Sequence, residues 1–284
     1  MKSILVGIDG STRGQRALAW AARQADREGA RLTLVCVVDP GFARAAGMDD
    51  EEVDAAVEAT LGALVGTVAA TYPQLETATD VIIGKVVESL VDAAEGHDMI
   101  VLGSHHGATV GEVIGAAKGL RVSVSAGIPT VLVPADWDPD VPSSGVVVGV
   151  ASDDSAEAAV SFAAREALAS DQPLRLISAW GLPSFLSRPA EAMGGGLAPV
   201  GEQFQRNLAE RVRVLKDENP GLDVSAEAPE GASPAQVLLQ RSAGSSLLVL
   251  GTHSRSALGR ALFGSVSHGV LLGLNVPTVV VPCK

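Results

Sequence analysis

Three residues in the second half of the chain have the types and spacing needed to hold a phosphate group. Gly251 follows an apolar run, and Gly264 and Ser265 open a helical pattern further on. Glycine lets a backbone turn sharply and approach an anion, and free N–H groups at a helix start attract negative charge. A phosphate there would contact backbone amides and the Ser265 hydroxyl, with Arg255 or Arg260 in reach. An ordinary strand-to-helix connection with a serine N-cap fits equally well.

A carboxylate stands in the corresponding place of the first half only. In a doubly wound sheet, ligands bind beyond the carboxyl ends of the strands, where the strand order reverses. That position brings Asp9 beside Gly103 in the first half. In the second half it brings Ala151 beside Gly251. The carboxylate and the glycine–serine helix start are therefore in different halves of the chain.

Other reactive side chains give weaker signals. His105, His106 and His253 follow the same strands, but no carboxylate or cysteine stands at metal-ligand spacing, so a loop role is favoured. The acidic run 49–52 suits the positive end of a helix better than a metal site. Cys36 and Cys283 indicate buried, reduced thiols rather than a disulfide framework.

No catalytic motif is present in the sequence. We find no P-loop, no dinucleotide-binding glycine motif and no nucleophile elbow. No nucleophile has an identifiable base. We therefore expect a protein that is not an enzyme, with weak ATPase activity left open.

The elements that position these residues occur twice. The segment 6–11 returns as 148–153, and 101–105 returns as 249–253, so the offset grows from 142 to 148 residues. A repeat of this length predicts two tandem domains rather than a solenoid. We place the first domain at 1–136, a proline-containing linker at 137–144 and the second domain at 145–284.

Each copy alternates short apolar runs with longer helical patterns, which predicts parallel strands covered by helices on both faces. The predicted strands are 3–8, 32–38, 79–83, 99–102 and 130–133, then 146–150, 174–179, 222–226, 247–250 and 278–281. The predicted helices of the first copy are 12–28, 50–71, 86–95 and 115–126. An irregular stretch at 181–201 holds the insertion, and we favour a surface loop over a lid.

Composition excludes several partners. The net charge of −12 and the aromatic content of 3% argue against a nucleic-acid surface. The N-terminus lacks a signal-peptide pattern, and the apolar C-terminal stretch is interrupted and too short for a bilayer. We expect a cytoplasmic protein with no membrane partner.

Taken together, the motifs resemble the universal stress protein family in its tandem-domain form. They comprise Val-Gly-Ile-Asp-Gly-Ser at 6–11, Leu-Gly-Ser-His at 102–105, Gly-Ser-Val-Ser at 264–267 and the closing Pro-Thr-Val-Val-Val-Pro at 277–282. The resemblance implies an α/β fold of two tandem Rossmann-like domains, each with a doubly wound, five-stranded parallel sheet. Its ATP-binding members pair an aspartate after the first strand with a Gly-x2-Gly-x9-Gly-Ser/Thr motif.

The second copy matches most of that motif. Ser254 replaces the middle glycine, and Ala151 replaces the aspartate. The resemblance places adenine and ribose near Ala179 and Leu250 and the phosphates over the motif. The nucleotide site implied in the second domain consists of Ala151, Ala179, Leu250, Gly251, Ser254, Gly264, Ser265 and Val266.

The first copy keeps a degenerate crevice. Asp9, Val37, Gly103 and His106 would line it, but Ala116 and Ala117 stand where the family has its last glycine and serine. We therefore expect no ATP in the first domain, and a smaller polar ligand stays open.

The resemblance implies a regulatory stress-response protein that binds ATP, with Mg²⁺, in its second domain without robust turnover. The alternative is a scaffold or regulatory protein in which both sites are degenerate. The strands 130–133 and 278–281 are expected to pair the two domains into an intramolecular pseudo-dimer, because pairing removes exposed strand edges. Assembly of two chains into a homodimer is left open.

Overall fold

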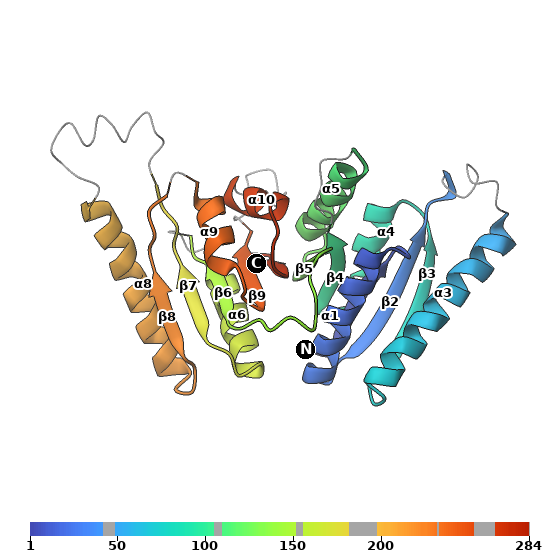
Figure 1. Cartoon of the computed structure of the whole chain (residues 1–284), viewed down its shortest axis with the longest axis horizontal. Helices are drawn as coiled ribbons and strands as arrows, with labels where there is room; N and C mark the ends of the chain where they lie inside the picture. Colours follow the sequence, from blue (N-terminus) through green and yellow to red (C-terminus); the bar gives the residue numbers. More distant parts are fainter. Residues whose placement is uncertain are drawn as a thin grey trace. The chain divides into compact units, whose positions relative to one another are not determined.

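The computed structural model describes residues 1–41, 49–104, 110–151, 156–181, 198–231, 233–252 and 265–283. The chain divides into two compact units, Met1–Val141 and Pro142–Lys284 (Figure 1). Each unit contains one doubly wound α/β domain, as the alternation of apolar runs and helical patterns predicts.

In the first unit five parallel strands form a sheet in the order β3-β2-β1-β4-β5. The order reverses between β1 and β4, the position at which such sheets bind ligands. The strands are β1 (Ser3–Ile8), β2 (Arg31–Val38), β3 (Thr77–Ile83), β4 (Met99–Ser104) and β5 (Thr130–Pro134). The helices with described bounds are α1 (Thr12–Glu28), α3 (Asp50–Thr71), α4 (Val86–Ala93) and α5 (Val110–Ser125).

Apolar runs place β1 and β4 in the interior of the first unit. Ile4, Val6 and Ile100 are fully buried, as expected for strands covered on both faces. The helix α1 packs on β1 and β4, whereas α4 and α5 pack against each other and against β2 and β4. The carboxyl ends of β1 and β4 are thereby fixed between these helices.

The helix α3 begins with a capping box. The Asp49 carboxylate accepts a hydrogen bond from Glu52 N at 2.9 Å, and Glu52 accepts one from Asp49 N at 3.2 Å. This reciprocal pair satisfies two free N–H groups and confirms that the acidic run starts a helix. Among the described helices, α3 contains one stretch, Glu51–Thr71, that is long and apolar enough to cross a membrane by length and composition, and only 11% of it is buried. The helix contacts β2 and β3.

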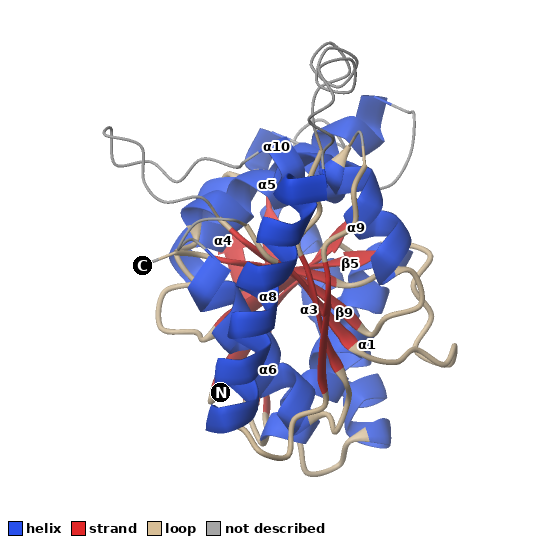
Figure 2. Cartoon of the chain, turned by 90° about the vertical axis from the view of Figure 1, so that its left-hand side faces the viewer, coloured by secondary structure: helices blue, strands red, loops and turns tan. Residues whose placement is uncertain are grey.

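The second unit repeats the arrangement with the order β8-β7-β6-β9-β10. Its strands lie between helices (Figure 2). The strands are β6 (Val146–Gly149), β7 (Leu174–Ile177), β8 (Val224–Glu227), β9 (Leu247–Gly251) and β10 (Thr278–Val281). The helices with described bounds are α6 (Glu157–Ala169), α8 (Ala198–Glu218), α9 (Pro234–Ser242) and α10 (Ser265–Leu272).

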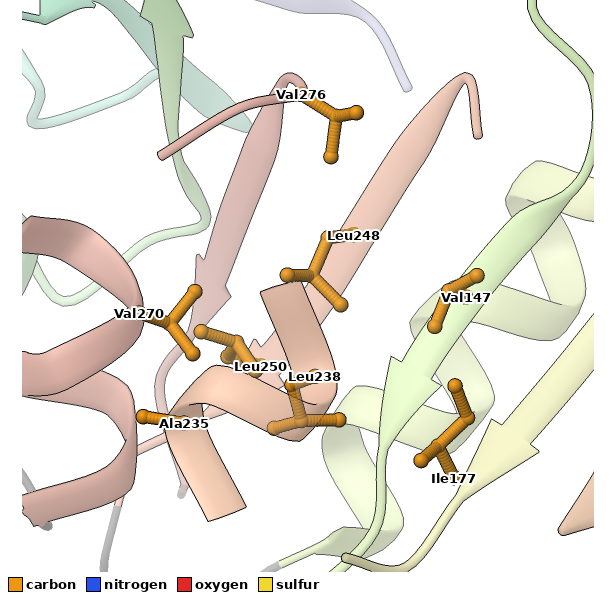
Figure 3. Close-up of a cluster of buried hydrophobic side chains, with 8 residues drawn as sticks. All are labelled: Val147, Ile177, Ala235, Leu238, Leu248, Leu250, Val270 and Val276. Atoms are coloured by element: carbon orange, nitrogen blue, oxygen red, sulfur yellow. The ribbon is translucent and has the colours of Figure 1, made fainter. Parts of the chain in front are cut away.

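The helices α9 and α10 close over this sheet through one buried cluster. Figure 3 shows side chains from α9 and α10 meeting those of β6, β7 and β9. The cluster consists of Val147, Ile177, Ala235, Leu238, Leu248, Leu250, Val270 and Val276. It forms a rigid apolar floor beneath the carboxyl ends of the strands.

The predicted bounds need several corrections. The largest concerns α5, which begins at Val110 rather than at the predicted 115. Neither Gly111 nor Gly115 ends the helix, since a glycine inside a helix costs only about 1 kcal/mol and the sequence there holds no proline. The strand β8 begins at Val224 rather than 222, and β3 begins at Thr77 rather than 79. Most of the stretch 181–201 lies outside the described residues.

Candidate functional site

A cavity of about 300 Å³ opens at the carboxyl ends of β1 and β4 in the first unit, and we call it the first cavity. It contains three of the residues predicted for the first-domain crevice, Asp9, Val37 and Gly103. The fourth, His106, lies outside the described residues. The lining residues are Gly7, Ile8, Asp9, Gly14, Val35, Val37, Val86, Leu90, Leu102, Gly103, Lys118, Gly119 and Val122.

Asp9 is held at the cavity by the turn that follows β1. Gly10 has a φ of +73°, which L side chains rarely adopt, and turns the chain toward α1. Ser11 N donates to Asp9 Oδ1 at 3.0 Å, and the Ser11 hydroxyl donates to the same oxygen. Oδ2 lies 4.0 Å from Arg13 Nη2, a distance typical of a weak ion pair. One carboxylate oxygen is therefore used locally, and the other has capacity to accept from a ligand.

Gly14 makes room for this carboxylate. A Cβ atom at position 14 would lie 2.8 Å from Asp9 Oδ1, closer than real Cβ contacts. Asp9 in its present position therefore requires glycine at position 14. The sequence analysis did not identify Gly14, because its role depends on a contact that only the fold reveals.

The second unit has a cavity of about 220 Å³ in the same place, which we call the second cavity. It brings together five residues of the predicted nucleotide site, namely Ala151, Ala179, Leu250, Gly251 and Val266. Ser265 is the first residue of α10, directly before Val266. Ser254 and Gly264 lie outside the described residues. The other lining residues are Gly149, Val150, Ala156, Ile177, Ser178, Phe204, Pro234, Leu238 and Ser267.

The two cavities are equivalent, but their charges differ. Applying the repeat offsets of 142 and 148 residues, Asp9 corresponds to Ala151 and Lys118 corresponds to Val266. Both charged residues line the first cavity, whereas their apolar counterparts line the second. Gly14 corresponds to Ala156, so the second copy has lost the carboxylate and the space for it together.

The helix that follows the fourth strand can be compared between the two domains over its described residues. In the second unit α10 is described from Ser265 onward, and Val266 and Ser267 line the cavity. Ser267 Oγ donates to Gly251 O at 3.3 Å, which joins α10 to the end of β9.

In the first unit α5 begins seven residues before Ala117, the counterpart of Ser265. Ala116 and Ala117 are therefore inside the helix, where N–H groups bond to carbonyls four residues earlier. A phosphate cannot use those N–H groups without unwinding a turn. The position that corresponds to Ser265 therefore lies in the interior of α5 in the first domain.

An aromatic wall of the second cavity was not predicted. Phe204 of α8 lines the cavity and stacks on Trp180 with ring centroids 5.8 Å apart and 8° between the planes. Trp180 Nε1 donates to Ala228 O at 3.0 Å, which fixes the indole. The only sequence signal for Phe204 was that it is an apolar residue on a mostly polar helix, far from every motif.

Cys36 and Cys283 form no disulfide, and each is half-buried rather than fully buried as expected. Burial raises the pKa of the Cys36 thiol, and the negative charge of Asp9 raises it further. Cys36 is therefore a protonated thiol at neutral pH and a poor nucleophile. Cys283 Sγ donates to Thr252 O at 2.6 Å, at the end of β9.

Within the described ranges, His, Cys, Asp and Glu side chains form no group of three or more that would hold a metal ion. The three histidines considered above lie outside those ranges.

The family assignment follows from the repeat, the doubly wound sheets and the paired cavities. The universal stress protein family model matches residues 1–134 and 144–282, and the chain belongs to this family. A universal stress protein of Mycobacterium tuberculosis H37Rv is 28% identical over 288 residues, covering 98% of this chain and 96% of that protein. A universal stress protein of Mycolicibacterium smegmatis is 27% identical over 298 residues, with coverages of 98% and 96%.

Solved structures show the same fold over the whole chain. A universal stress protein from Archaeoglobus fulgidus DSM 4304 superposes with a TM-score of 0.68 at 17% identity, covering 99% of this chain and 96% of that one. A protein of unknown function from Pseudomonas aeruginosa PAO1 gives a TM-score of 0.60 at 18% identity, with coverages of 99% and 92%. These similarities show the fold, and the two matches of the family model show two tandem universal stress protein domains.

Proposed function

We propose that this protein binds ATP in its second domain and acts through binding rather than turnover. The observation that carries the proposal is that Val266 and Ser267, directly after the first described residue of α10, line the second cavity. A helix that starts at Ser265, as the sequence predicts, would offer free N–H groups and the positive end of the helix dipole to a phosphate chain. The first domain has no helix start at that place.

The walls of the second cavity suit a flat aromatic ring. Ile177, Leu238 and Leu250 are buried apolar residues, and Ala179 and Val266 pack against the same cluster. Ligand pockets are mostly apolar with a few polar groups that fix orientation, and here Ser178 and Ser267 supply hydroxyls. Adenine would lie against Ala179 and Leu250, and Mg²⁺ would arrive with the phosphates.

The alanine at position 151 is expected to limit the affinity of the second cavity for ATP. A carboxylate in its place would accept hydrogen bonds from the ribose hydroxyls, as acidic residues do in dinucleotide-binding folds. Without it the proposed site relies on the helix start and on apolar packing. The absence of charged side chains among the described lining residues also favours the alternative, a scaffold that binds no nucleotide.

Native mass spectrometry of freshly purified protein separates these two functions. ATP binding predicts a mass increment of one adenine nucleotide per chain, retained at low collision energy. The alternative outcome is a purified chain that carries no nucleotide and binds none when ATP is added at about 1 mM, a concentration that detects even weak binding. That result would contradict ATP binding and support the scaffold function. An assay of phosphate released from ATP then tests the expectation that the protein does not hydrolyse ATP robustly.

A further inference from the structure

We infer that a pocket at the amino ends of β7 and β8 binds a guanidinium group on an aliphatic stem, as in the side chain of arginine. The pocket has a volume of about 200 Å³, and Asp171 and Asp223 are among its lining residues. It lies where these strands begin, whereas the second cavity lies where they end. This site, which we call the amino-end pocket, is therefore separate from the proposed ATP site.

The first domain shows what the equivalent of Asp223 binds. Leu174 N donates to Asp223 O at 2.8 Å in the second domain. In the first domain Leu32 N donates to Glu76 O at 2.9 Å, and the strand registers agree, so Asp223 and Glu76 are equivalent. Arg31 Nε lies 3.1 Å from Glu76 Oε1. A guanidinium group therefore already pairs with a carboxylate at this place in the fold.

The second domain lacks this arginine and has a further carboxylate instead. By the repeat offset of 142 residues, Pro173 stands in the place of Arg31, and Asp171 stands in the place of Gly29. The backbone φ is positive at both of the latter positions, +52° at Asp171 and +59° at Gly29. Glycine adopts this conformation more readily than aspartate does, so the turn itself does not require a carboxylate.

The two carboxylates are exposed and available to a cation. Within the described ranges neither Asp171 nor Asp223 has an ion-pair partner. A planar guanidinium group matches carboxylate oxygens with paired N–H donors and is more weakly hydrated than an ammonium group, which favours arginine over lysine. Calcium would need about six to eight oxygen ligands. The described residues offer no group of three acidic, histidine or cysteine side chains here.

Apolar side chains beside the carboxylates suit the aliphatic stem. Leu168 lines the pocket and is 43% exposed, and Pro173 lines it as well. Arginine packs its methylene groups on apolar surface while its charged end reaches polar partners. Gln172 Oε1 accepts hydrogen bonds from Gly145 N, at 3.0 Å, and from the Ser246 hydroxyl, which fixes this part of the lining. The pocket is therefore formed before a ligand arrives.

An NMR titration that follows the backbone amides of the full chain tests the inference. The probes are agmatine, a free guanidinium compound, and the peptide acetyl-Gly-Arg-Gly-amide, which presents arginine as a protein does. We expect saturable shifts at the amides of Asp171, Leu222 and Asp223, with a Kd of about 1 mM or lower. Tighter binding of agmatine would indicate a small-molecule ligand, and tighter binding of the peptide would indicate the arginine of a partner protein.

Variants separate a specific site from general attraction of cations to an acidic protein. Asp171→Gly and Asp223→Asn should each weaken agmatine binding at least threefold, the scale of one exposed ion pair. Pro173→Arg should abolish binding, because the new side chain would pair with Asp223 as its counterpart does in the first domain. Asp54→Asn, which removes an exposed carboxylate from α3, is the matched control and should leave the affinity unchanged.

Equal affinity in wild type, Asp171→Gly and Asp223→Asn would overturn the inference. Shifts that do not saturate by about 10 mM agmatine, tenfold above the expected Kd, would overturn it as well. Saturable shifts with calcium chloride but not with agmatine would replace the guanidinium group by a metal ion. Asp171→Gly carries the glycine that the first domain has in the same conformation, so we expect it to fold. These outcomes do not depend on ATP, since the two sites lie at opposite ends of the strands.

Discussion

A Cβ atom at Gly14 would lie 2.8 Å from Oδ1 of Asp9, and the second copy has lost both members of this pair. Ala151 and Ala156 occupy the equivalent positions and line the second cavity. An alanine Cβ beside the aspartate would require the carboxylate to shift, so we expect the two replacements to be coupled. The second domain therefore lacks both the carboxylate and the glycine that makes room for it.

The coupling predicts how ATP affinity changes when a carboxylate is restored at position 151. Ala151→Asp alone should leave ATP affinity within about twofold of wild type, because Ala156 crowds the new carboxylate. Ala151→Asp combined with Ala156→Gly should raise affinity about tenfold, the scale of one or two added hydrogen bonds. Calorimetric titration with ATP measures both variants. An equal gain from the single and the double variant would show that the two positions are independent.

Gly103 should be sensitive to a single methyl group. A Cβ atom there would lie 2.7 Å from Arg13 O, a backbone atom that cannot move aside cheaply. We expect Gly103→Ala to destabilise the first domain by about 1–3 kcal/mol. Gly62→Ala is the control, since nothing lies within 4 Å of that position in α3, and it should stabilise by about 0.5–1 kcal/mol. Scanning calorimetry of both variants gives the comparison, and a stable Gly103→Ala would contradict the close approach.

The thiol of Cys36 should report the charge of Asp9. That charge raises the Cys36 pKa, although burial is the larger cause. Asp9→Asn should lower the pKa and speed alkylation by iodoacetamide at pH 8, by less than about tenfold because burial persists. Mass spectrometry of the Cys36 peptide measures the rate, with Cys283 as the internal control. An unchanged ratio of the two alkylation rates would contradict an effect of the Asp9 charge on the Cys36 pKa.

Asp98 should contribute to stability at neutral pH only. Hydrogen bonds from the N–H groups of Lys2, at 2.6 Å, and Ser3, at 3.0 Å, lower its pKa. The unfolded chain then binds more protons than the folded chain in acid, so the contribution is lost as the pH falls below about 4. Asp98→Asn should cost about 0.5 kcal/mol at pH 7, since the group is exposed, and less at pH 3. A loss of equal size at both pH values would contradict the charge argument.

Much of the fold could be predicted, because its signals are local in sequence. The apolar runs located the strands of both sheets, and the acidic run 49–52 located the start of α3 at the observed position. The start of α5 was placed too late because a glycine in sequence does not reveal whether a helix continues through it. The pairing of the two domains through their last strands stays a prediction.

The candidate sites could be predicted only in part. Motif spacing identified Asp9, Gly103 and Gly251, which follow strands, and the structure groups them around the two cavities. Gly14 and Phe204 escaped notice because each acts on residues distant in sequence. No sequence motif identified Lys118, and its place in the first cavity became clear only when the equivalent cavities were compared residue by residue.

Titration of ATP into wild type, Gly264→Val and Asp9→Asn tests the central claim most directly. If the second domain binds ATP, wild type should bind one ATP per chain. Gly264→Val should then lose at least tenfold in affinity, since a side chain would stand where the backbone approaches phosphate, and Asp9→Asn should match wild type. Two ATP molecules per chain, or loss in Asp9→Asn with Gly264→Val unaffected, would contradict the assignment of ATP to the second domain.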